Sequence, residues 1–199
     1  MRIELFRKEI LPFILWFLLL LILSRVSDEL LHWSGLGWVG SYLAYPGVGL
    51  ILLSFIYSVR KARWIPLGWF DRISLKSYLA FHELTAWFGV YLILIHAGIH
   101  MHAWLPWLAT VVMLISVISG FTGHILQARV SRAVKEKKSV LLKDGQSPTE
   151  VEEKIFRAAL MAKAMLKWRK FHRPLTAVFA GFALMHIITA MFFMSWRGL

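Results

Sequence analysis

Histidine is the residue type whose spacing in this sequence first suggests chemistry. The chain has eight histidines and no cysteine. His82 and His96 lie 14 residues apart, and so do His172 and His186. Fourteen helical residues turn about 1400°, about 40° short of four full circles, and rise about 21 Å. If both pairs lie on helices, the two rings of each pair share one helix face at two different depths.

The composition indicates where such helices lie. Of the 199 residues, 58% are hydrophobic and only 17% are charged. These proportions exclude a disordered chain and an ordinary water-soluble enzyme, and they indicate an integral membrane protein. The absence of cysteine excludes disulfides, thiolate zinc sites, cysteine-bound iron–sulfur clusters and covalently attached c-type haem.

Five apolar stretches reach, or nearly reach, the length of roughly 20 residues that a helix needs to cross the hydrocarbon layer. They cover about residues 10–24, 38–59, 77–100, 103–128 and 174–196. The first is short, and we expect it to be a retained span. Trp168 and most other tryptophans lie near predicted span ends, as expected for interfacial aromatic residues. We predict an all-α membrane fold of five transmembrane helices in a single domain, residues 1–199.

The basic residues predict the orientation of these spans. Of the 23 Lys and Arg residues, 21 fall in the segments that share a side with the N-terminus. The positive-inside rule therefore predicts a cytoplasmic N-terminus and an external C-terminus. The net charge of +12 is then a topology signal, and we expect no nucleic acid partner.

The segment 129–173 carries 13 of the basic residues, which predicts a basic cytoplasmic connector. Ser147, Pro148 and Glu150 form a capping-box pattern at the start of an amphipathic helix over about 148–170. We expect this helix to contact membrane lipid or a partner subunit, with a solvated connector as the alternative.

The predicted topology pairs the histidines. The third and fifth spans are parallel, so His82 and His172 lie at the cytoplasmic level and His96 and His186 at the outer level. Two imidazoles on opposite faces of a porphyrin hold a six-coordinate haem, which carries electrons. We therefore predict a bundle that binds two haem b groups. The alternatives are polar residues that bridge helices and a histidine-lined proton or metal pathway.

This pattern resembles the di-haem cytochrome b superfamily and, in helix order, the ferric-reductase-like transmembrane domain. The resemblance covers about Ser77 to Trp196, and the four paired histidines match the family's ligand positions. We find no Pro-Glu-Trp-Tyr segment and no flavin or nicotinamide domain, so the resemblance implies a haem scaffold within a larger complex.

Several other residues are candidates for the surroundings of the haems. Gly89 lies midway between His82 and His96, where it would leave room for a planar group or for close helix packing. Candidate partners of the haem propionates are Arg72, Arg169, Arg173 and His100.

Glu83 and His124 are candidates for a quinone site, with structural hydrogen bonding as the alternative reading for each. His32 is expected in an outer loop, without an assigned role.

From these residues we predict a di-haem b-type cytochrome, the electron-transfer subunit of an oxidoreductase complex. Its expected partners are a quinone pool and a c-type cytochrome or iron–sulfur subunit, and its expected location is a bacterial or archaeal cytoplasmic membrane. The competing hypotheses are a histidine-lined proton or metal transporter and a haem-free membrane anchor subunit.

Overall fold

The computed structural model describes residues 7, 10–62, 72–98, 103–141 and 148–196. Helix accounts for 94% of these residues, and they contain no β-strand. The chain divides into two compact units, residues 1–102 and 103–199. Five described helical stretches are long and apolar enough to cross a membrane: Leu11–Trp33, Gly37–Ala62, Leu75–Ala97, Trp104–Lys135 and Ile155–Phe192. The prediction of an all-helical chain with five helices of this kind is confirmed.

The first helix, α2 (Leu11–Trp33), is longer than its predicted span. It continues nine residues beyond residue 24, through a charged stretch where the sequence predicts a loop. The charges pair along the helix, because Arg25 lies 2.9 Å from Asp28 and also bonds to Glu29. The helix ends just before Gly35, which has a positive φ of 75°. His32 is therefore helical, and its predicted place in an outer loop is wrong.

The second predicted span consists of three helices in series, α3 (Gly37–Tyr42), α4 (Ala44–Ser54) and α5 (Ile56–Ala62). Leu43 separates α3 from α4, and Phe55 separates α4 from α5. Pro46 follows the first interruption and has no N–H to bond to the carbonyl of Tyr42. The stretch is still apolar enough to count as one candidate span.

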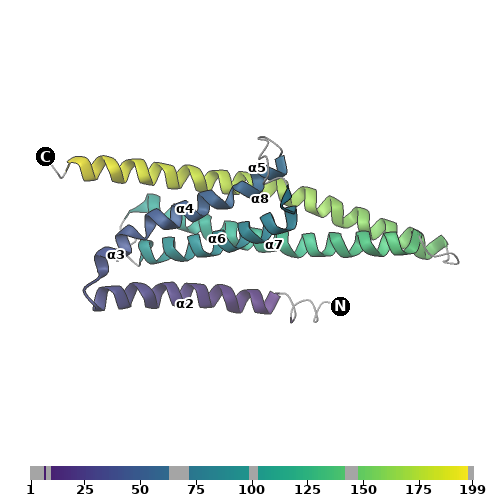
Figure 1. Ribbon diagram of the computed structural model, residues 1–199, viewed down its shortest axis with the longest axis horizontal. Helices are drawn as coiled ribbons and strands as arrows, with labels where there is room; N and C mark the ends of the chain where they lie inside the picture. Colours follow the sequence, from purple (N-terminus) through teal and green to yellow (C-terminus); the bar gives the residue numbers. More distant parts are fainter. Residues whose placement is uncertain (1–6, 8–9, 63–71, 99–102, 142–147, 197–199) are drawn as a thin grey trace. The chain divides into compact units, whose positions relative to one another are not determined.

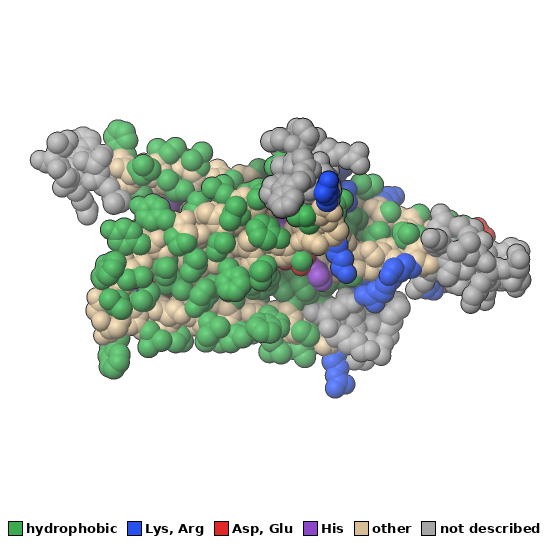
Figure 2. Space-filling view, viewed as in Figure 1, with side chains coloured by type: hydrophobic (Ala, Val, Ile, Leu, Met, Phe, Trp, Pro, Cys, Tyr) green, Lys and Arg blue, Asp and Glu red, His purple; other side chains and the backbone are tan. Residues whose placement is uncertain are grey.

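The third span is α6 (Leu75–Ala97), which Ser74 caps by accepting a hydrogen bond from the backbone N–H of Ser77. Both α2 and α4 pack against α6 (Figure 1). On the outside of this unit the apolar side chains are exposed: Leu15 is 58% exposed and Trp16 66%. Figure 2 shows hydrophobic side chains over most of the visible face of α2, as expected for a surface that faces lipid.

The second unit is a pair of long helices, α7 (Trp104–Leu141) and α8 (Pro148–Trp196), that run side by side. At 1.5 Å per residue, their 38 and 49 residues make rods of about 57 and 74 Å, each longer than the hydrocarbon layer is thick. Extensions of the two spans therefore build most of the predicted connector 129–173.

The sequence predicts an end to the connector helix near residue 170, but α8 continues without a break. Pro174 lies inside this helix, although its ring nitrogen cannot bond to the carbonyl of Lys170. Membrane helices tolerate such a proline when neighbouring helices and side chains compensate for the lost bond. α8 packs against α7, the neighbouring helix of its unit.

Candidate functional site

His82 is held by a main-chain atom. Its Nδ1 lies 2.8 Å from the carbonyl oxygen of Ser54, the last residue of α4. A carbonyl oxygen only accepts hydrogen bonds, so Nδ1 carries the proton and donates it. The lone pair of His82 therefore lies on Nε2, the nitrogen that a metal would take. The ring also lies 5.6 Å from the ring of Tyr57 in α5.

The interruption at Phe55 explains why a carbonyl is available there. The last carbonyls of a helix have no partner within that helix and commonly accept bonds from elsewhere. His82 projects from α6 toward the end of α4 and takes one of them. Neither Ser54 nor Tyr57 was recognisable in the sequence, because the interruption itself was not predicted.

Gly89 serves helix packing in this structure. A Cβ atom at Gly89 would lie 3.0 Å from the carbonyl oxygen of Gly47 and 2.9 Å from Cγ1 of Ile51, both in α4. At Gly47, a Cβ atom would lie 2.9 Å from Cγ1 of Ile93. The sequence predicted that the space beside Gly89 would accommodate either a planar group or a closely packed helix. In the structure, α4 fills that space. Gly89 therefore permits the close approach of α4 and α6.

His96 is half-buried and lies on α6 two turns beyond Gly89. By helical register it shares a side of α6 with Gly89 and His82. This side carries both candidate ligands of the first unit.

In the second unit, His172 is held by side chains of two helices. Its Nδ1 lies 3.1 Å from Oγ of Ser119 in α7. Its ring stacks on Trp168 with ring centres 4.9 Å apart and planes inclined by 18°. The indole N–H of Trp168 donates to the carbonyl oxygen of Ser119 at 2.8 Å. Ser119 therefore anchors both rings, through its side chain and its backbone.

Gly123 of α7 makes room for the ring of Trp168. A Cβ atom at Gly123 would lie 2.1 Å from Cζ2 of Trp168, closer than any side chain permits. A Cβ atom at Gly120 would lie 3.9 Å from Cε1 of His172, an ordinary contact distance. Trp168 thus contacts α7 directly, whereas its position near a span end had suggested only interfacial anchoring.

His186 is half-buried on α8, and by register it lies on the same side as His172. The hydroxyl of Thr189 donates to the carbonyl oxygen of His186 at 2.9 Å. The opposite side of α8 is apolar and open, with Ile188 53% exposed and Phe192 68% exposed. The two histidines of the second unit thus lie on the side of α8 away from its exposed apolar face.

The remaining candidates are distributed over both units. Glu83 is half-buried in α6, whereas His124 is exposed in α7. Arg72 and Arg173 are exposed and Arg169 is half-buried. His100 lies outside the described residues. Glu83 and His124 belong to different units, as do the two histidines of each predicted pair.

Within the described ranges, no three His, Asp or Glu side chains form a group that could hold a metal ion. A haem iron that takes two imidazoles needs no such group. Comparisons with known proteins add no further candidate: no family model, no curated protein and no solved structure matches this chain.

Proposed function

We propose that this chain is a di-haem b-type cytochrome that transfers electrons across the membrane as a subunit of a larger complex. The observation that carries this proposal is the way His82 is anchored. A histidine that binds a metal through Nε2 nearly always donates its other ring N–H to a carbonyl, a carboxylate or a water. His82 has such a bond, from Nδ1 to the carbonyl oxygen of Ser54.

His172 supports the same role from the other unit. Its Nδ1 is bonded to a hydroxyl and its ring stacks on Trp168, so coordination of a metal would use Nε2. In the proposed arrangement, His82 and His172 hold one haem and His96 and His186 hold the other. The orientation inferred from the basic residues puts the first haem at the cytoplasmic side.

A bound haem b would supply a reversible one-electron couple between ferric and ferrous iron. The chain's own residues would orient and charge-balance it. Arg169 and Arg173 follow Trp168 on α8, and Arg72 precedes α6, so all three would pair with propionates at the cytoplasmic level. His100 is the proposed counterpart at the outer level.

The same proposal assigns Glu83 and His124 to a quinone site, where carboxylate and imidazole exchange protons with the quinone. It also assigns a c-type cytochrome or iron–sulfur subunit as the redox partner. A bacterial or archaeal cytoplasmic membrane is the proposed location.

One observation favours a second candidate function, a haem-free membrane anchor. The side of α6 that bears His82 packs against α4 at Gly89, and the side of α8 that bears His172 packs against α7. Histidines in such positions stabilise a membrane protein simply by bridging helices. The anchor hypothesis therefore predicts a colourless protein in which all four histidines are structural.

A pyridine haemochrome assay on the purified full chain separates the two. We expect two haem b groups per chain. His82→Ala and His186→Ala should each lose about one of the two, because a six-coordinate haem needs both imidazoles. Phe171→Ala is the matched control, since it removes an exposed ring beside His172. A colourless protein, or unchanged haem content in both histidine variants, would overturn the proposal.

A further inference from the structure

Three exposed lysines form a stripe along one side of α8. Lys163, Lys167 and Lys170 follow one another at intervals of four and three residues, and all three are exposed. Residues at these intervals lie one above another on a helix. Met165, between them in the sequence, is only 6% exposed, and by register the three lysines lie on the opposite side of the helix. We call them the lysine stripe.

The same side of α8 continues toward the C-terminus as an open apolar surface. Val178, Met185 and Ile188 share the register of the lysine stripe and are 49%, 52% and 53% exposed. An apolar side of this kind on a helix that crosses a membrane faces lipid. The lysine stripe therefore points toward the same lipid, a few turns farther along the helix.

The depth of the lysine stripe follows from the rise of the helix. Lys170, Lys167 and Lys163 lie four, seven and eleven residues before Pro174, where the predicted apolar span begins. These intervals correspond to about 6, 10 and 16 Å. The headgroup layer is about 5–7 Å thick on each side of the hydrocarbon, and charges act over about 8 Å more at physiological ionic strength. Lys170 thus lies in the headgroup layer, Lys167 just outside it and Lys163 at the limit of its electrostatic reach.

The first turns of α8 lie beyond that reach. Phe156 is 66% exposed, but it precedes Pro174 by 18 residues, or about 27 Å along the helix. Because α8 is unbroken from Pro148 to Trp196, its first turns do not lie flat on a bilayer that the rest of the helix crosses. Contact with lipid headgroups is therefore expected only from the turns that carry the lysine stripe.

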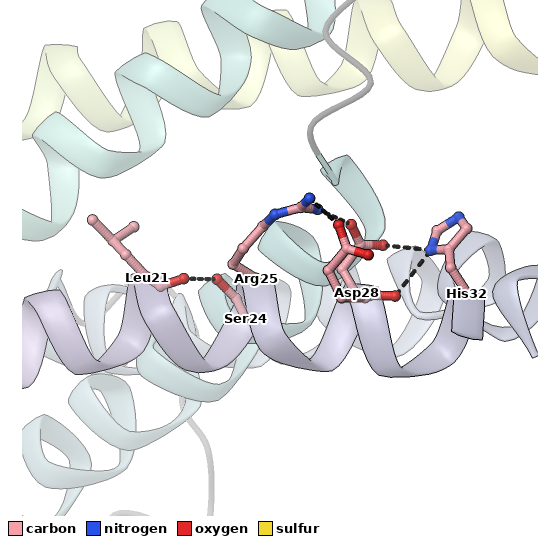
Figure 3. Close-up of polar contacts among 6 residues, drawn as sticks. Leu21, Ser24, Arg25, Asp28 and His32 are labelled. Atoms are coloured by element: carbon pink, nitrogen blue, oxygen red, sulfur yellow. Dashed lines mark hydrogen bonds and ion pairs between the residues drawn. The ribbon is translucent and has the colours of Figure 1, made fainter. Parts of the chain in front are cut away.

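The described part of the second unit offers the lysine stripe no nearby carboxylate. The sequence has no Asp or Glu after Glu153, which lies ten residues before Lys163, and none between residues 104 and 135 of α7. Two exposed arginines elsewhere differ in this respect: Arg157 bonds to Glu153, and Arg25 of α2 bonds to Asp28 (Figure 3). Like charges three and four residues apart destabilise a helix, so the lysine stripe requires an anion from outside its unit.

We propose that the lysine stripe binds the phosphate groups of anionic phospholipids in the leaflet at this end of the span. Basic side chains immediately outside a membrane helix attract anionic headgroups. The positive-inside rule requires basic residues at this end of the span, but it does not require them to share the lipid-facing side of the helix. That position, at headgroup depth, favours lipid phosphate over an acidic protein surface. The inference does not depend on haem, so it stands apart from the proposed function.

The first test measures which lipid lies beside the lysine stripe. The chain has no native cysteine, so a fluorophore on Phe171→Cys reports one position, exposed beside Lys170. The full chain is placed in phosphatidylcholine vesicles with a small fraction of nitroxide-labelled phosphatidylglycerol or nitroxide-labelled phosphatidylcholine. Phosphatidylglycerol should quench at the lower fraction. A lysine at the membrane surface contributes roughly fivefold to such a preference, so Lys163→Gln, Lys167→Gln and Lys170→Gln combined should abolish most of it.

The single variants should lower the preference in the order Lys170, Lys167, Lys163, because the interaction decays with distance from the headgroups. Arginine at all three positions should preserve it. Arg157→Gln is the matched control, because it removes an exposed cation of α8 that is already paired and lies about 26 Å from Pro174. An undiminished preference in the triple glutamine variant, as expected if the stripe binds an acidic protein, would overturn the proposal. An equal loss in Arg157→Gln would also overturn it.

The second test uses thermal unfolding and predicts opposite signs in two media. In neutral detergent, the triple glutamine variant should be at least as stable as the native chain, because its like charges no longer repel one another. In nanodiscs, added phosphatidylglycerol should raise the Tm of the native chain more than that of the variant, because a ligand stabilises the state that binds it. Equal gains in Tm, or a variant that is already destabilised in neutral detergent, would overturn the inference.

Discussion

The two units hold their candidate ligand histidines by different means. In the first unit the acceptor for His82 is a main-chain carbonyl, which permits only one ring tautomer. In the second unit the partner of His172 is the hydroxyl of Ser119, which can donate or accept, and the ring is clamped by Trp168. The first arrangement fixes the proton without any side chain, whereas the second depends on side chains of α7 and α8.

The largest effect should come from Gly123→Ala. The new methyl group would overlap the Trp168 ring and force it away from Ser119, which disturbs the stack on His172. We expect a loss near the upper end of the roughly 1–3 kcal/mol typical of overpacking, measured by thermal unfolding in detergent. Gly181→Ala is the control, because no heavy atom lies within 4 Å of its Cβ position. Equal stability of the two variants would contradict the clamp.

Gly89→Ala should have the next largest effect, and it probes the first unit. Its Cβ atom would meet the Gly47 carbonyl at 3.0 Å, so α4 and α6 must separate slightly. A loss of about 1–2 kcal/mol is expected, and the bond between His82 and Ser54 should weaken with it.

Gly49→Ala serves as the reference on α4, since its Cβ position is open. If Gly89→Ala is as stable as Gly49→Ala, the close crossing of α4 and α6 does not require a glycine at position 89.

The sharpest contrast between the units comes from removing one hydroxyl in each. Ser119→Ala removes the partner of His172 Nδ1 and should cost about 1 kcal/mol. Ser54→Ala removes a buried bond from the hydroxyl to the carbonyl oxygen of Ile51 and should also cost about 1 kcal/mol, but it leaves in place the carbonyl that binds His82. Nitrogen NMR of the ring atoms should show an altered proton position at His172 only. An altered tautomer at His82 in Ser54→Ala would refute the main-chain anchor.

Periodicity and apolar length were sufficient to predict the helices that bear the histidines. The same reasoning failed at the end of α2, because a charged run such as Arg25 to Glu29 resembles a loop until its charges are seen to pair with one another. It also failed at Pro174, where α8 continues through a local helix-breaking signal.

The candidate site was only partly accessible from the sequence. Spacing identified His82 and His172, but their partners are a backbone atom and a serine that carry no motif. Gly123 has no distinguishing neighbour in the sequence, and its role becomes visible only when Trp168 is placed against it. Partners chosen by tertiary packing, rather than by local pattern, therefore lay beyond sequence reasoning.

The unbroken course of α8 has a mechanical consequence. Because a single helix connects residue 148 to residue 196, a rotation applied to its beginning turns His172 and His186 by a similar angle. A subunit that bound the exposed side chains of Phe156 and Leu160, near the start of α8, would act on the same rigid helix that carries both histidines. In the proposed complex, such a subunit would turn both imidazoles together.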